Sequence, residues 1–338
     1  MYLKNITTLY KKRMEYNLEE MEKSIRLLKP TLKPGSMKFY LTSLRRAREI
    51  NGSDNMDFIK DPKSVKKMLT EHIPLGSKEP MKYTSVRNTM IPISVYLESQ
   101  NKDFKYNDII EEYKTMINKY NQQYSEEQKD GKLKGRQVDN MITKEEFETL
   151  LKSLNEQIAL YKKKKEIMKL GANELSRTRV WILFNILKDI PTRLDFAGMK
   201  LISQREYKSL KNRNLLTGNY LVGSRGSYRF SFNEYKTNKV YGENVVEIDK
   251  PLRLKLNLYL KLNDFKNEDV IFPMSRNAMS SLLNKTSYSI IKKRVSAQIL
   301  RKFYVSEKYG GINQEQAKDA KMMSHTISTQ QGIYNKTN

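Results

Sequence analysis

The chain has 338 residues, enough for two domains, and it contains no cysteine and only two histidines. These counts exclude disulfides, thiolate nucleophiles and zinc sites built on sulfur, so a metal site would have to rest on carboxylates. The 63 lysines and arginines outnumber the 38 aspartates and glutamates, and the net charge of +25 is typical of a protein that binds a polyanion. DNA or RNA is therefore the leading partner, and a merely basic or ribosomal protein is the plain alternative.

The distribution of apolar residues argues against a membrane protein. Apolar residues make up 38% of the chain, and no stretch approaches the run of about 18 that a spanning helix requires. The opening text, MYLKNITTLYKKR, has no apolar core of a secretion signal. We therefore expect a soluble protein that is not secreted and has no membrane partner.

The first third of the chain shows the period of amphipathic helices. The apolar residues that share the face of the first clear helix are Met37, Tyr40, Leu41 and Leu44. Three further stripes follow, and Pro92 is expected to kink one of them. We predict a bundle of four helices within residues 31–122, and a separate helical arm within residues 1–30.

A polar stretch separates this bundle from a second domain. Residues 123–142 contain glycine and lack an apolar period, so we predict an interdomain linker. Thr143 and Glu146 then match a capping box, with Ile142 and Phe147 at the positions of a hydrophobic staple. The second domain is therefore expected to begin with a helix at Thr143.

The middle of the second domain changes to a β pattern. A helical stripe ends at Pro191, just before Arg193. Between residues 219 and 248 the short β-prone pieces NYLV, YRFSF and VVEI alternate with the turn GSRG and the polar tip EYKTNK. A helical pattern resumes at Leu252 and lasts to the end of the chain. The predicted fold is mainly α with a small antiparallel β-sheet.

Five residues in the second domain stand in a suggestive order. Tyr334 follows His325 by nine positions in SHTISTQQGIY, and Arg301 precedes both in QILRKFY. Arg193 lies upstream in PTRLD, and Lys236 lies on the polar tip between the two arginines. In this order and approximate separation the residues resemble the motifs of the tyrosine recombinase (phage integrase) family.

The resemblance implies an architecture and a source. Residues 143–338 would form the α+β catalytic domain of such a recombinase, and residues 31–122 would be its helical core-binding domain, which binds DNA. Proteins of this family serve DNA integration and recombination in viruses and mobile elements. The chain would therefore be found wherever its DNA is, in a host cytoplasm or nucleus or in a virion.

The chain departs from the family's pattern at several positions. Gln298 stands where the family has the first histidine of His-x-Leu-Arg, and a glutamine cannot accept a proton in that place. Ser324 replaces the glycine usual before the histidine, and Phe196 stands where a glutamate is common, with Asp195 one place earlier. Lys239 is a rival to Lys236 for the lysine of the motif. Gln298 is kept among the candidate site residues.

The resemblance also implies a mechanism. Tyr334 would attack DNA and form a 3′-phosphotyrosine, which conserves the bond energy, so that neither ATP, a metal nor another cofactor is needed. Arg193 and Arg301 would stabilise the charge of the five-coordinate phosphorus, and His325 would donate a further hydrogen bond. Lys236 would act as general acid for the leaving 5′ oxygen.

These residues are consistent with three functions. The first is a site-specific recombinase that acts on double-stranded DNA as a homotetramer on two sites. A type IB topoisomerase would use the same chemistry as a monomer to relax supercoils. A DNA-binding protein that has lost catalysis is consistent with Gln298.

Overall fold

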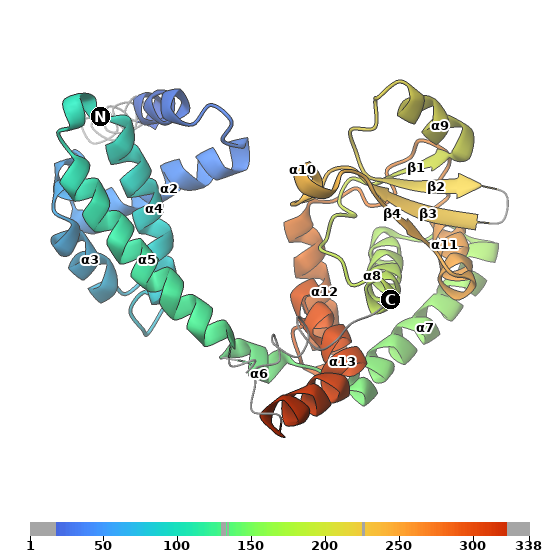
Figure 1. Cartoon of the computed structure of the whole chain (residues 1–338). Helices are drawn as coiled ribbons and strands as arrows, with labels where there is room; N and C mark the ends of the chain where they lie inside the picture. Colours follow the sequence, from blue (N-terminus) through green and yellow to red (C-terminus); the bar gives the residue numbers. More distant parts are fainter. Residues whose placement is uncertain (1–17, 130–132, 134, 225–226, 323–338) are drawn as a thin grey trace, which may run out of the picture. The chain divides into compact units, whose positions relative to one another are not determined.

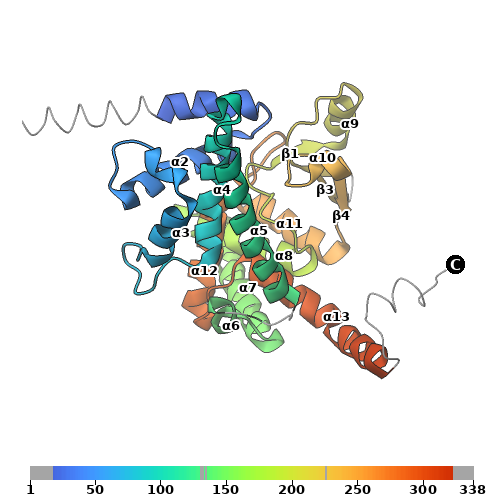
Figure 2. The same ribbon diagram turned by 60° about the vertical axis from the view of Figure 1, so that its left-hand side comes forward.

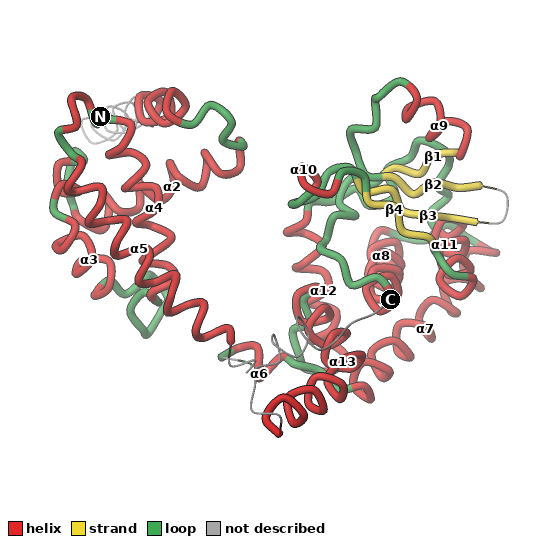
Figure 3. Tube along the Cα trace, viewed as in Figure 1, coloured by secondary structure: helices red, strands yellow, loops and turns green. Residues whose placement is uncertain are grey.

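Helices dominate the chain, and the strands are confined to one region (Figures 1 and 3). The computed structural model describes residues 18–129, 133, 135–224 and 227–322. The chain divides into two compact units, Met1–Lys132 and Leu133–Asn338, which we call unit 1 and unit 2. Within the described residues it is mainly helical, with a four-stranded mixed sheet in unit 2.

Unit 1 contains the predicted bundle. Its helices are α2 (Pro34–Asn51), α3 (Pro62–Glu71), α4 (Tyr83–Ser99) and α5 (Asn107–Lys129), with short 3-10 turns η1 (Asp57–Lys60) and η2 (Lys102–Phe104). Asp61 caps α3 by accepting hydrogen bonds from the backbone of Lys63 and Ser64. Helix α2 ends at Gly52, whose φ of 69° suits a residue without Cβ. The prediction of four helices is confirmed, and α4 continues across Pro92.

The helical residues before α2 belong to the same core. Residues 18–28 are helical, and Met21 and Ile25 are buried among the apolar side chains of unit 1. The prediction of a separate arm is therefore wrong for these residues, because burial of Met21 and Ile25 attaches them to the bundle. Residues 1–17 of the predicted arm lie outside the described residues.

The predicted linker is helical over much of its length. Helix α5 runs on to Lys129, and the short helix α6 (Arg136–Asn140) follows in unit 2. The residues that extend α5 are Gln, Glu, Lys and other polar types, which support a solvated helix without an apolar stripe. The two units meet within the predicted range of 123–142, and helices occupy much of that range on either side of the boundary.

Unit 2 surrounds its sheet with helices (Figure 1). The helices and strands after α6 are α7 (Lys144–Ile167), α8 (Ala172–Asp189), β1 (Lys200–Ser203), α9 (Gln204–Asn212), β2 (Tyr220–Ser224), β3 (Ser227–Phe232), α10 (Asn238–Tyr241), β4 (Asn244–Glu247), α11 (Lys250–Leu262), α12 (Arg276–Ile291) and α13 (Ala297–Met322). The predicted capping box is present at the start of α7, where Glu146 and Thr143 bond to each other's backbone.

The sheet is mixed, with the strand order β1-β2-β3-β4. The pairs β2/β3 and β3/β4 are antiparallel, as expected, with Tyr220 opposite Ser231 and Phe230 opposite Val246. Strand β1 adds a parallel pair with β2, so the prediction of a wholly antiparallel sheet is wrong. The polar tip before β4 also forms the short helix α10.

The two faces of the sheet pack against different helices. Leu221 and Phe230 join the main core with residues of α8 and α11, whereas Tyr220 and Val222 pack with Tyr207 of α9. This alternation follows from the two-residue period of a strand. Figures 1 and 2 both place α9 beside β1, on the side away from α8.

Helix α8 is the centre of the main core. It contacts α7, α11, α12 and α13, and its residues from Val180 to Leu187 are all buried. Trp181 is 3% exposed and donates a hydrogen bond of 2.8 Å to Asn155, so it is a core residue. The end of α8 therefore provides a rigid support for the loop that follows it.

Candidate active site: an arginine pocket in unit 2

Arg193 lies on the loop that follows α8. Its side chain is exposed, while the neighbouring Leu194 and Phe196 are buried in the main core. The backbone oxygen of Arg193 accepts hydrogen bonds from Asp195 N at 2.7 Å and from the hydroxyl of Thr192 at 3.0 Å. The loop is thus tied to the core on one side and leaves the guanidinium on the surface.

Arg301 lies in the second turn of α13, far along the chain from Arg193. Leu300 is 1% exposed and Ile299 is buried, so this turn is fixed against the core. Ser296 caps the helix, since its hydroxyl accepts from Ile299 N at 3.3 Å. The half-buried Arg301 is therefore held on a rigid element.

The two arginines line one pocket of about 410 Å³. The other residues that line it are Thr192, Asp195, Phe232, Tyr235, Thr237, Tyr241, Glu243 and Asn244. They come from the loop after α8, the end of β3, the connection through α10 and the start of β4. The fold thus brings together two of the predicted site residues from distant parts of unit 2.

Asp195 organises the arginines. Its side chain is buried, and its Oδ1 lies 2.8 Å from the guanidinium of Arg276, in an ion pair without hydrogen-bond alignment. Burial raises the pKa of Asp195, and three guanidinium groups oppose that shift, those of Arg276, Arg193 and Arg301. One carboxylate therefore interacts with three cations, and its ion pair is with Arg276.

Arg276 is a member of this cluster that the sequence analysis missed. It is the first residue of α12, and Ser275 caps that helix by accepting from Ala278 N. Its local sequence, PMSRNAM, is typical of the exposed start of a helix and gives no sign of a buried partner for Arg276. Only the packing of α12 beside the loop after α8 reveals the contact.

Asn219 joins the two loops that border the pocket. Its amide nitrogen donates to Asp195 O at 2.7 Å and to Glu234 O at 3.0 Å. Its amide oxygen accepts from the backbone nitrogens of Asn233 and Glu234, both at 2.8 Å. The buried amide thus uses both of its donors and both lone pairs on backbone groups. It links the loop of Arg193 to the segment that leads to Lys236.

Lys236 and Lys239 are both exposed. Lys236 lies on the turn before α10, and Lys239 lies within α10. Tyr235 and Thr237, on either side of Lys236, line the pocket, but neither lysine does. The geometry therefore does not separate the two lysines, and both stay candidates for the lysine of the motif.

The remaining predicted residues lie elsewhere or outside the described residues. Gln298 is exposed in the first turn of α13 and does not line the pocket. His325 and Tyr334 lie outside the described residues. Phe196 is fully buried, with its ring 5.3 Å from that of Phe230, so this position serves the core and cannot carry the glutamate's role.

The comparisons with known proteins find no match: no family model, no curated protein and no solved structure is similar enough to this chain. Among the residues that the structure describes, no group of three or more metal-ligating side chains of His, Asp or Glu forms a site for an ion. No helix within the same residues is long and apolar enough to cross a membrane.

Proposed function

We propose that this chain is a site-specific DNA recombinase or integrase of the tyrosine recombinase type, which cuts and rejoins strands through a 3′-phosphotyrosine. The observation that supports the proposal is the convergence of Arg193 and Arg301 on one pocket. Two guanidinium groups that line one pocket suit the extra negative charge of a five-coordinate phosphorus, because each presents a planar fork of donors.

The proposed step exchanges one phosphoester for another. The phenolic oxygen of Tyr334 forms a bond to phosphorus while the bond from phosphorus to the 5′ oxygen breaks. The phenolic proton passes to solvent, and Lys236 or Lys239 donates a proton to the 5′ oxygen. Attack by a second 5′ hydroxyl reverses these events and rejoins a strand. The energy of the ester is conserved, so the step consumes no ATP.

The proposed partner is double-stranded DNA, bound by four copies of the chain on two sites. Two strands from each of two duplexes must be exchanged, and each cleavage uses one tyrosine. The high positive charge of the chain supports binding to the phosphate backbone.

Covalent trapping tests the proposal. The wild type, Tyr334→Phe and Tyr288→Phe are incubated with nicked duplex fragments of genomic DNA from the source, and the products are separated in SDS. Tyr288→Phe is the matched control, because Tyr288 is an exposed tyrosine of α12. We expect a protease-sensitive DNA adduct with the wild type and with Tyr288→Phe, and none with Tyr334→Phe. No adduct with the wild type, or an adduct that survives Tyr334→Phe, contradicts the proposal.

Two activity assays separate the rival functions. Strand exchange between two sites is expected of a recombinase, whereas relaxation of a supercoiled plasmid without exchange would indicate a type IB topoisomerase. DNA binding with neither activity and no adduct would indicate a binding protein without catalysis.

A further inference from the structure

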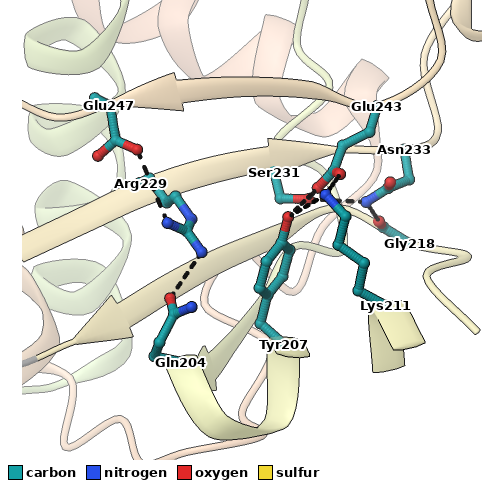
Figure 4. Close-up of polar contacts among 9 residues, drawn as sticks. All are labelled: Gln204, Tyr207, Lys211, Gly218, Arg229, Ser231, Asn233, Glu243 and Glu247. Atoms are coloured by element: carbon teal, nitrogen blue, oxygen red, sulfur yellow. Dashed lines mark hydrogen bonds and ion pairs between the residues drawn. The ribbon is translucent and has the colours of Figure 1, made fainter. Parts of the chain in front are cut away.

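Glu243 lies at the edge of the arginine pocket in a network of its own (Figure 4). Its Oε1 accepts hydrogen bonds from the hydroxyls of Ser231 at 2.6 Å and Tyr207 at 2.7 Å. Its Oε2 accepts from Lys211 Nζ at 2.8 Å, and the same ammonium lies 3.3 Å from the Tyr207 hydroxyl. Three donors from α9 and β3 thus hold one carboxylate that follows α10.

The network holds Glu243 in its charged form. The Glu243 side chain is 17% exposed, and burial alone would raise its pKa. The bonds from Lys211, Ser231 and Tyr207 outweigh burial, so the pKa of Glu243 is lowered. Burial and the bond to Glu243 raise the pKa of Tyr207, which therefore remains a phenol and a donor.

Glu243 fixes the far end of the segment that carries the two candidate lysines. Next to it, Gly242 adopts a φ of 66°, and its carbonyl oxygen accepts from the Tyr235 hydroxyl at 2.8 Å. The near end is held by Asn219, as described above, and Asn238 Nδ2 donates to Asn233 O at 2.8 Å. The segment is therefore anchored on both sides, while Lys236 and Lys239 remain exposed.

We propose that Glu243 is a positioning residue, and that the clamp on its carboxylate fixes residues 235–242 beside the two arginines. In the same arrangement Lys211 neutralises a negative charge that would oppose a phosphate in the pocket. The anchoring part stands on the fold alone, whereas the role of Lys211 toward phosphate rests on the proposed function.

Charge explains why the carboxylate needs its own cation. Glu243 lines the pocket, and an unbalanced carboxylate there would repel a phosphodiester, since like charges repel. Lys211 is 55% exposed, and its bond to Glu243 raises its pKa, so the pair is neutral as a unit. Removal of Lys211 alone leaves the carboxylate unbalanced, and removal of both charges restores neutrality.

Amide hydrogen exchange of the full chain tests the anchor without any need for activity. Glu243→Gln keeps the size of the side chain but breaks the ion pair with Lys211. We expect exchange across residues 235–242 to rise about tenfold, with the buried turns of α12 unchanged. If Glu243→Gln does not fold, Tyr207→Phe removes one bond to the carboxylate and is expected to raise exchange in the same segment. Unchanged exchange in both variants overturns the anchor.

A double-mutant cycle tests the role of Lys211. We expect Lys211→Met to slow adduct formation about tenfold, and Glu243→Gln combined with Lys211→Met to be about threefold faster than Lys211→Met alone, because neutrality returns while the anchor stays broken. Lys208→Met is the control, because it removes the same charge from an exposed site of α9. A double variant no faster than Lys211→Met, or a Lys211→Met as fast as the wild type, overturns this role.

The two tests distinguish failure of this inference from failure of the proposed function. Failure of the wild type to form any adduct contradicts the proposed function and the role of Lys211 together, while hydrogen exchange still decides the anchor. A wild type that forms the adduct, with a cycle that shows no rescue, contradicts only the role of Lys211.

Discussion

Arg301 and Arg193 each carry a guanidinium group, a planar fork of hydrogen-bond donors that matches the oxygens of a phosphate. Both line one pocket, and their charges act together with that of Arg276 on the buried carboxylate of Asp195. A phosphate that enters the pocket would meet two arginines whose backbone is held against the core before it binds. Such preorganisation gives a hydrogen-bond donor its effect on a transition state.

Arg301→Ala is expected to slow adduct formation by about a hundredfold to a thousandfold, because one preorganised donor to the transition state is lost. DNA affinity should change by about twofold or less, since one phosphate contact among many is removed. Arg294→Ala is the control, because Arg294 is an exposed arginine stacked on Tyr288. Equal losses of DNA binding and adduct formation in Arg301→Ala would contradict a transition-state role.

Asn219→Ala is expected to lower the free energy of unfolding of unit 2 by about 2 to 4 kcal/mol, because several buried backbone groups lose their partners. Denaturant unfolding followed by circular dichroism measures this change. Asn212→Ala, at an exposed position of α9, is the control and should change stability by about 0.5 kcal/mol or less. Equal stability of Asn219→Ala and the control would show that the clamp does not hold the loops.

The start of α7 is joined by an ion pair to the turn before α13. The Glu146 carboxylate accepts from Thr143 N, and it also pairs with Lys293 at 2.7 Å. The bond from Lys293 is the largest cause of the lowered pKa of Glu146, and burial opposes it. Because the folded pKa lies below the ordinary value of 4.5, the stabilisation is present above that value and disappears as the pH falls through the folded pKa.

Glu146→Gln is therefore expected to cost about 1 kcal/mol of stability at neutral pH, since the pair with Lys293 is partly exposed. The difference from the wild type should shrink in acid, as the wild-type carboxylate takes up its proton. Thermal unfolding across a pH series measures both. Glu148→Gln, on an exposed position of the same helix, should show no such pH dependence. A deficit of Glu146→Gln that stays constant into acid would contradict the assignment.

Local signals predicted most elements, and pairing between distant segments decided the rest. The apolar period predicted α2, α4 and α8, and the capping box predicted the start of α7. Strand β1 was not predicted, because its parallel partner β2 lies beyond α9 and the pairing is therefore not local. Helix α10 depends on contacts such as the hydrogen bond from Asn238 Nδ2 to Asn233 O, which the local sequence pattern does not predict.

The site shows the same division. Arg193 and Arg301 could be chosen from the order of motifs, and the fold brings them to one pocket. The sequence could not identify Arg276, Asn219 and Glu243 as site residues. Residues of these polar types are usually solvated. Their roles arise from contacts with residues far along the chain.

At the scale of the whole molecule, the net charge of +25 sets the response to salt. Each phosphate that a lysine or arginine neutralises releases counterions from DNA, so affinity falls steeply with ionic strength. For about six such contacts, the affinity should fall about a thousandfold between 50 and 200 mM salt. Fluorescence anisotropy with a labelled duplex measures the slope, and a flat response would contradict DNA as the polyanion.

In the proposed reaction, the phenol of Tyr334 attacks DNA held by the arginine pocket. Protease digestion of the trapped adduct, followed by mass spectrometry, identifies the residue that carries the nucleotide. We predict a 3′-phosphonucleotide on the peptide that contains Tyr334, with no label on Tyr235 or Tyr241 of the pocket. A nucleotide on any other residue, or a 5′-linked nucleotide on Tyr334, would contradict the account.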